Sequence, residues 1–170
     1  MDVFVLSMER WLHFLSGITW LGLLFYFNLV QVPALNEAAA DKDGPGPAAI
    51  AKYVAPRALL WFRWAAVVTW LSGAAYLYTA PHLDFVEAFT LSEGSRVIGV
   101  GAWIGTIMLL NVWLLIWPCQ KKILGLVQAS DEEKAAARRT AALTSRINLM
   151  LSFPMLLFMG GSAHGLPLTT

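Results

Sequence analysis

The sequence predicts an all-α integral membrane protein, a bundle of four transmembrane helices in one domain over residues 1–170. Four apolar stretches fill the chain, and they lie at residues 8–33, 58–80, 97–117 and 147–164. A helix rises 1.5 Å per residue and the hydrocarbon core of a bilayer is about 30 Å thick, so about 20 residues cross it. Three stretches reach that length and the fourth lies near the lower limit, which predicts four spans.

Composition supports the same fold class. Hydrophobic residues make up 58% of the chain, charged residues make up 14%, and the mean hydropathy is +0.60. A very apolar soluble bundle is the alternative, but long apolar runs between short polar segments favour contact with a lipid bilayer. The net charge of +1 gives no reason to expect a nucleic-acid partner. The single cysteine, Cys119, excludes an internal disulfide and a CxxCH attachment site for covalent haem c.

Basic residues orient the predicted spans. With four spans, the first and third connections lie on the same side of the membrane, and these two connections carry most of the positive charge. Their basic residues are Lys42, Lys52, Arg57, Lys121, Lys122, Lys134, Arg138, Arg139 and Arg146. The amino terminus offers only Arg10, and the second connection offers only Arg96. The positive-inside rule therefore places the first and third connections in the cytoplasm and both termini outside.

The connections themselves predict shorter helices. After the turn-forming sequence DKDGPGP, residues 48–54 predict a short helix before the second span. Residues 82–95 mix acidic and apolar side chains, as in a helix that lies in the outer membrane interface. Residues 120–146 contain the strong helix former DEEKAAARR. We expect this segment to form a cytoplasmic helical extension between the third and fourth spans.

A few residues mark the ends and the packing of the spans. We expect Pro118 to kink the end of the third span, because proline cannot donate a helical hydrogen bond. Thr144 or Ser145 is the expected cap at the start of the fourth span. Residues 19–22 and 69–73 share a TWLxG-like pattern, which predicts close helix packing through small side chains.

All three histidines lie at the outward end of the predicted spans. His13 lies inside the first span, His82 begins the second connection, and His164 closes the fourth span. A histidine in hydrocarbon needs a partner, and neutral imidazole is a common axial ligand of haem iron. The pair His13 and His164 therefore predicts a haem b site between two helices. Small and aromatic neighbours would make room for the flat porphyrin and wall its pocket, namely Gly17, Gly160, Gly161 and Trp20.

Alternatives to haem stay open at this point. The histidines are also compatible with a lone metal ion, and a membrane histidine can stabilise packing alone when it hydrogen-bonds a carbonyl. At the opposite end, Arg63 lies within the second span, near Asn28, Asn111 and Asn148 of the other spans. No carboxylate of a span lies at its depth, so Arg63 either binds an anion or carbonyls or extends to the inner headgroups.

Each span contains short segments that together are typical of one family. In chain order the segments are WLHF, GITWLGLLFYFN and QVP, then WFRW and TWL, then NVW and IWPCQK, and finally SRIN, SFPML and His164. These segments resemble the amino-terminal membrane domain of PuuD-type urate hydroxylases. The resemblance covers nearly the whole chain in order. The first span is also similar, more weakly, to membrane-bound protoporphyrinogen oxidases, which are helical haem proteins, and this similarity favours a porphyrin at His13.

The resemblance implies oxidation of urate in the bacterial inner membrane, with electrons passed to a c-type cytochrome that is often fused at the carboxyl end. The chain ends six residues after His164, so we expect no attached cytochrome. Cys119 stands where the family pattern has asparagine, a departure that puts urate hydroxylation itself in question. The resemblance makes His13 and His164 candidate haem ligands. It also makes five residues candidates for a substrate pocket at the inner end, namely Arg63, Asn28, Asn111, Asn148 and Gln120.

Two functions follow as hypotheses. The first is a haem b oxidoreductase or electron carrier that donates electrons to a c-type cytochrome outside. The second is a non-catalytic accessory subunit of a larger respiratory or photosynthetic complex, since eight tryptophans give this small chain a broad packing surface. The substrate, the partner and any homo-oligomerisation stay open. A transporter is disfavoured because the spans carry neither an inverted repeat nor an acidic proton relay.

Overall fold

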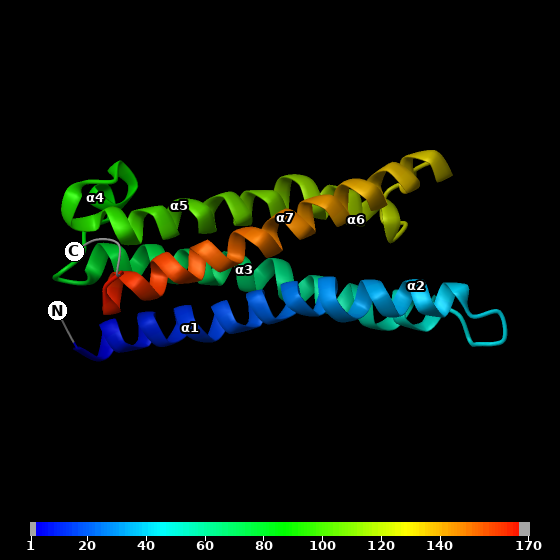
Figure 1. Cartoon of the computed structure of the whole chain (residues 1–170), viewed down its shortest axis with the longest axis horizontal. Coiled ribbons are helices and arrows are strands. Elements are labelled where there is room, and N and C mark those ends of the chain that lie inside the picture. The colour runs from blue at the N-terminus through cyan, green and yellow to red at the C-terminus, as the bar shows by residue number, and fades with distance from the viewer. Residues whose placement is uncertain (1–2, 167–170) are drawn as a thin grey trace.

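The computed structural model describes residues 3–166 as long helices that lie side by side in a bundle (Figure 1). In chain order the elements are α1 (Val3–Tyr26), η1 (Phe27–Gln31), α2 (Val32–Ala40), η2 (Ile50–Val54), α3 (Ala55–Thr79), α4 (Phe85–Thr90), η3 (Glu93–Ser95), α5 (Arg96–Leu110), η4 (Asn111–Ile116), α6 (Trp117–Ile123) and α7 (Asp131–His164). No strand occurs in residues 3–166, so the predicted all-α class is confirmed.

Adjoining elements merge into four continuous helices that are long and apolar enough to cross a membrane. These helices are Val3–Ala40, Ile50–Thr79, Glu93–Ile123 and Asp131–His164. The four apolar stretches predicted from the sequence lie along them, and their outward-facing apolar side chains suit contact with a lipid bilayer. The structure is therefore consistent with a multi-pass membrane protein.

The bundle has two distinct ends (Figure 1). The start of α1 and the end of α7 lie at the end that carries α4, which we call the α4 end. The loop 41–47 lies at the opposite end, beside α2, which we call the α2 end. Helix α1 packs mainly along α3, and α5 packs mainly along α7. A buried apolar cluster joins all four helices, and it includes Trp20, Phe62, Met108 and Met155.

Prolines explain three widened turns near the α2 end. The segments η1, η2 and η4 are π-helical, and each ends two residues before a proline, respectively Pro33, Pro56 and Pro118. Proline lacks an N–H, and its ring clashes with the carbonyl four residues earlier, which in each case lies inside the π segment. Widening the turn relieves this clash. After η1, for example, the N–H of Val32 bonds the carbonyl of Phe27, five residues back.

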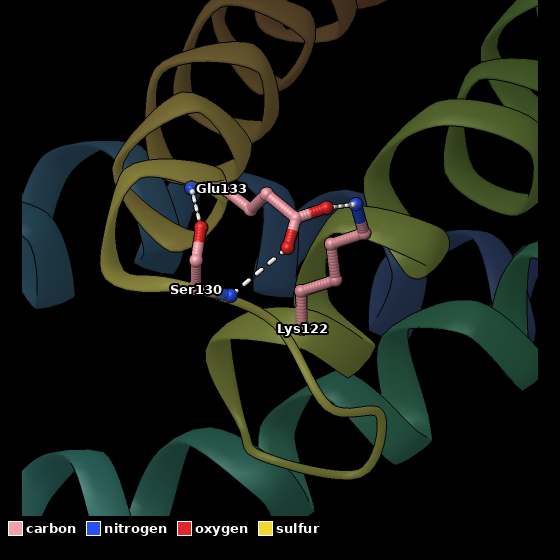
Figure 2. A network of polar contacts seen from close by, with 3 residues as sticks. All are labelled: Lys122, Ser130 and Glu133. Atoms are coloured by element: carbon pink, nitrogen blue, oxygen red, sulfur yellow. Dashed lines mark hydrogen bonds and ion pairs between the residues drawn. The ribbon is translucent and has the colours of Figure 1, made fainter.

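Helix α7 corrects one prediction. We expected the fourth span to begin at a cap formed by Thr144 or Ser145, but α7 runs without interruption from Asp131 to His164. Its cap is Ser130, whose hydroxyl accepts from the N–H of Glu133 at 3.2 Å, while the Glu133 carboxylate accepts from the Ser130 N–H at 2.9 Å (Figure 2). The predicted cytoplasmic extension and the fourth span are thus one helix. The capping box supplies hydrogen-bond partners for N–H groups at the start of this helix.

The start of α7 is also tied to α6. The Lys122 ammonium donates to the second Glu133 oxygen at 3.3 Å (Figure 2). Glu133 precedes the apolar part of α7, which begins at Ile147, by about four turns. The Ser130 N–H and the Lys122 ammonium lower the pKa of the Glu133 carboxyl below its ordinary value, because both stabilise the ionised form. This network joins the ends of the third and fourth long helices across residues 124–129.

The two shorter helices expected in the connections are present. The expected helix over residues 48–54 corresponds to η2 and the two residues before it, and it continues directly into α3. In the second connection, α4 begins at the cap Asp84, whose side chain accepts from the N–H of Glu87 at 2.9 Å. Both predictions are confirmed as helices. The position of α4 in a membrane interface stays a prediction.

Candidate site at His13

His13 faces α3 rather than the outside of the bundle. Its Nδ1 lies 2.8 Å from the backbone carbonyl oxygen of Thr69. A carbonyl oxygen can only accept a hydrogen bond, so Nδ1 must be the protonated nitrogen. In the neutral ring the other nitrogen, Nε2, is then unprotonated and carries a free lone pair. A lone pair on Nε2 is what binding to a metal or accepting a proton requires.

One glycine of α3, Gly73, lies against the His13 ring. A Cβ atom placed on Gly73 would lie 2.8 Å from Cε1 and 2.9 Å from Nδ1 of His13, closer than real Cβ atoms approach. The absence of a side chain at position 73 therefore makes space for the imidazole. Gly17, which we predicted to leave room for a porphyrin, instead faces α3, where an added Cβ would be 3.7 Å from the Thr69 methyl carbon.

The sequence does not reveal the part played by Thr69 and Gly73. It predicts a packing motif at residues 69–73 but not the contact of this segment with His13. The TWLSG pattern was the available signal, but the atom that receives His13 is a backbone carbonyl, which any residue type supplies. Spacing along the chain also could not reveal that α3 lies on the His13 side of α1.

The other two histidines lie in different surroundings. His164 is the last residue of α7 and is exposed, and His82 is exposed in the loop after α3, where its ring lies 6.4 Å from that of Tyr76. Within residues 3–166 no hydrogen bond or ring contact joins His13 to His164. Gly161, the predicted porphyrin neighbour, packs against the side chain of Leu166.

Trp20 belongs to the core of the bundle. It is 2% exposed and lies in the apolar cluster with Leu24 and Phe62. Its indole N–H is buried and has no hydrogen-bond partner among the residues that the structure describes. Trp20 lies about two helical turns after His13, toward the centre of the bundle, and its side chain fills the interior there.

Asparagines form a second polar region, nearer the α2 end. The Asn28 amide donates to Ser145 Oγ at 2.9 Å, which links η1 to α7. The Asn111 amide donates to Asn148 Oδ1 at 2.8 Å, and the Asn148 amide donates to the Met108 carbonyl at 3.0 Å. Asn148 is fully buried, at 0% exposure. Asn111 and Asn148 thus bond each other, Asn28 bonds Ser145, and together these contacts join α7 to η1 and to the α5–η4 helix.

Arg63 and Gln120 lie apart from the asparagines. They line a narrow crevice between α3 and the η4–α6 helix, together with Leu59, Phe62, Val112, Ile116 and Trp117. The Arg63 guanidinium lies 3.8 Å from the centre of the Trp117 ring, a cation–π contact. Across residues 3–166 no ion pair involves Arg63. The five residues predicted to form one substrate pocket thus occupy two places, and none of the three asparagines lines the Arg63 crevice.

A family model described as urate oxidase N-terminal matches residues 81–169, just over half of the chain. The chain belongs to the urate oxidase N-terminal family. The resemblance seen in the sequence is therefore confirmed. No curated protein and no solved structure matches the chain.

The family match covers one part of the candidate sites. It extends from the loop before α4 through α7, so it includes Asn111, Gln120, Asn148 and His164. His13 and Arg63 lie before the matched residues. Their assignment rests on their own surroundings in α1 and α3 and on the resemblance of the segments that contain them.

His13 and His164 have ring nitrogens that suit the role of axial ligands of haem iron. A ligating histidine commonly donates its other ring N–H to a backbone carbonyl, which sets the tautomer and the ring orientation. His13 has this arrangement, with Thr69 as acceptor. Exposed at the end of α7, His164 has no hydrogen bond within the described residues that would occupy its ring nitrogens. No cluster of three or more His, Cys, Asp or Glu residues suited to a bare metal ion occurs in residues 3–166.

Proposed function

We propose that this member of the urate oxidase N-terminal family is a haem b-binding membrane protein in electron transfer or oxidoreduction, related to urate hydroxylase membrane domains. The hydrogen bond from His13 Nδ1 to the Thr69 carbonyl carries the proposal, because it leaves an unprotonated imidazole nitrogen within an apolar helix. An imidazole held in one tautomer is suited to ligate iron. The family supports the oxidative class of reaction.

The proposed location is the bacterial inner membrane, with both termini in the periplasm. The α2 end carries nearly all basic residues of the connections, whereas the α4 end carries Arg10 and Arg96. Positive residues favour the cytoplasmic side. The α4 end, with His13 and His164, would then face the periplasm. A periplasmic c-type cytochrome is the proposed electron acceptor, since the histidines lie on that side.

His13 and His164 would hold the haem iron, and the haem would supply one-electron chemistry. His13 is fixed by α3, whereas His164 is exposed and has to be oriented when it binds. For an anionic substrate such as urate, Arg63 would pair with the negative charge and Gln120 would hydrogen-bond the ring. The amides of Asn28, Asn111 and Asn148 are already engaged, so they would support this region by holding the helices.

An absorption spectrum tests the proposal. The protein is expressed with haem supplied, purified in detergent and measured in oxidised and reduced forms. We expect a Soret band that shifts on reduction, that disappears in His13→Ala and that changes in His164→Ala. His82→Ala is the matched control, since His82 is exposed in a loop, and we expect its spectrum to be unchanged. Circular dichroism of each variant verifies that the helices remain.

The contrary result is equally clear. A folded wild-type protein without a Soret band contradicts haem binding. If that protein also co-purifies with subunits of a respiratory or photosynthetic complex and shows no redox turnover, it is an accessory subunit. A Soret band that survives in His13→Ala contradicts the assignment of His13 as ligand.

A further inference from the structure

The α3 segment that receives His13 has a property that ordinary helical segments lack. A helical side chain points back toward the amino terminus, so it covers the turn that precedes it. The side chain four residues after a carbonyl therefore lies over that carbonyl. In α3 the residue four positions after Thr69 is Gly73. The Thr69 carbonyl already accepts a hydrogen bond from Ser72 Oγ at 3.1 Å. Because position 73 has no side chain, the same carbonyl is also open to a donor from α1.

The His13 ring occupies the space of the missing side chain. An added Cβ at position 73 would lie 2.8 Å from Cε1 and 2.9 Å from Nδ1 of His13, whereas its distance to Nε2 would be 3.7 Å. A methyl group and the ring in its present position are therefore incompatible. The ring is the end of a flexible side chain, so the less costly response to a substitution is for the imidazole to move while α3 stays in place.

A similar pattern in α1 lacks this role. Gly22 closes the segment 19–22, and a Cβ added to Gly22 would have no atom within 4 Å. Gly17, one turn from His13 on α1, also tolerates a Cβ, because its nearest neighbour would be the Thr69 methyl carbon at 3.7 Å. Among these three glycines, only Gly73 is required by the position of the histidine.

We propose that Gly73 is a positioning residue for His13. By exposing the Thr69 carbonyl, it holds the imidazole in the tautomer with Nδ1 protonated and Nε2 bare. A side chain at position 73 would remove that hydrogen bond and release the ring to other tautomers and rotamers. The consequence for iron ligation rests on the proposed function, but the effect on the ring itself does not.

Nitrogen-15 NMR of the histidine rings tests this inference without haem. Protonated and bare ring nitrogens resonate in separate regions, so the spectrum of neutral histidine reports its tautomer. Protein labelled with nitrogen-15 histidine is measured in lipid nanodiscs in alkaline buffer, and His13→Ala identifies the His13 signals. We expect the wild-type protein to show a protonated Nδ1 and a bare Nε2. Gly73→Ala should lose this pattern, and the matched control Gly17→Ala should keep it.

Two results would overturn the inference. The first is a wild-type His13 that carries its proton on Nε2, a measurement that needs no variant and holds even if Gly73→Ala fails to fold. The second is a folded Gly73→Ala protein whose His13 signals match those of the wild type.

Haem titration separates this inference from the proposed function. Loss of a partner that orients a ligating histidine typically lowers metal affinity about 10- to 100-fold. We expect a loss of that size for Gly73→Ala and none for Gly22→Ala, because a Cβ at position 22 would contact nothing within 4 Å. A wild-type protein with the expected tautomer but no haem binding contradicts the proposed function and supports the role of Gly73. Haem affinity that is unchanged in Gly73→Ala contradicts the role of Gly73 and supports haem binding independently.

Discussion

The bundle has two polar regions, one at His13 and one at the asparagines, and they satisfy their hydrogen-bonding groups in opposite ways. An unsatisfied polar group in an apolar interior costs several kcal/mol, so both regions must supply hydrogen-bond partners. The asparagines do so by pairing with each other and with a carbonyl, and Asn148 is left with no exposed surface. His13 pairs one ring nitrogen with the Thr69 carbonyl and leaves the other without a proton.

This difference distinguishes polar side chains that stabilise helix packing from a side chain that can bind a ligand. A side chain whose donors and acceptors are engaged can stabilise helix packing, but it offers little to a ligand. A side chain that is oriented by one bond and retains a free lone pair is prepared for a ligand. We therefore expect substitutions in the asparagine region to change mainly the free energy of unfolding. Substitutions at His13 should change mainly binding.

The largest effect on stability is expected for Asn148→Ala. The substitution removes the bonds to Asn111 and to the Met108 carbonyl and leaves a cavity in a fully buried position. We expect the free energy of unfolding to fall by about 2–3 kcal/mol. Unfolding in mixed detergent, followed by circular dichroism, measures it. Met150→Ala, at an exposed position of α7, is the matched control.

A double-mutant cycle sharpens this prediction. If Asn111 and Asn148 act as a pair, Asn111→Ala should cost little more once Asn148 has been replaced, because the two effects are not additive. Strict additivity, or a loss no larger than that of Met150→Ala, would show that the buried amides contribute nothing through their contact.

His13→Ala should have a smaller effect on stability. It removes one interhelical hydrogen bond, and bonds of this kind in membrane proteins contribute about 0.6 kcal/mol on average. Loss of ring contacts with α3 adds to this, so we expect about 1 kcal/mol in the same unfolding assay. The exposed His82 provides the control variant, His82→Ala. If His13→Ala destabilises the protein as much as Asn148→Ala, the proposed contrast between the two regions is wrong.

Ser145→Ala is expected to have a weaker effect still. The Asn28 amide would lose its bond to Ser145 Oγ but would keep its bond to the Leu24 carbonyl at 2.8 Å. A loss of about 0.6 kcal/mol is expected, the average for one such bond. Ser162→Ala, at an exposed position of the same helix, controls for the change in helix propensity. A loss above that of His13→Ala would contradict this ranking.

Last in the order of lost stability is Gln31→Met, for which we expect no loss. Gln31 is 7% exposed, and its Oε1 is buried with no hydrogen-bond partner in residues 3–166. Replacing an unsatisfied acceptor by an apolar group of similar shape is nearly neutral or stabilising. We expect the free energy of unfolding to stay the same or to rise by up to about 1 kcal/mol. A clear loss of stability would mean that Gln31 has an acceptor role that its protein neighbours do not explain.

Much of the fold was predictable, because the relevant properties are local. Length and hydropathy define each long helix, and the depth of a residue along its helix follows from counting at 1.5 Å per residue. His13 and Asn28 were thus assigned to different ends of the first span from the sequence. Pro118 marked a disturbance of the third span, and the structure shows a π segment, η4, directly before it.

Other features depended on contacts between helices. The prediction of a cap at Thr144 or Ser145 was wrong because a polar segment and an apolar one form a single helix, which Ser130 caps. The spans are apolar almost all round, so they lack the one-sided pattern that tells which face meets a neighbour. The sequence therefore could not show that Asn111 meets Asn148 while Arg63 meets the ring of Trp117.

The sequence by itself determined which helices form, how long they are and where the charged and polar residues lie along them. Only the tertiary structure decided what each polar side chain faces, because rotation about a helix axis is set by packing. His13 shows this most clearly. Its partner is the backbone oxygen of Thr69, made accessible by the missing side chain of Gly73. That this carbonyl can be reached from α1, and that Gly73 leaves space for the ring, is seen only when the two helices lie against each other.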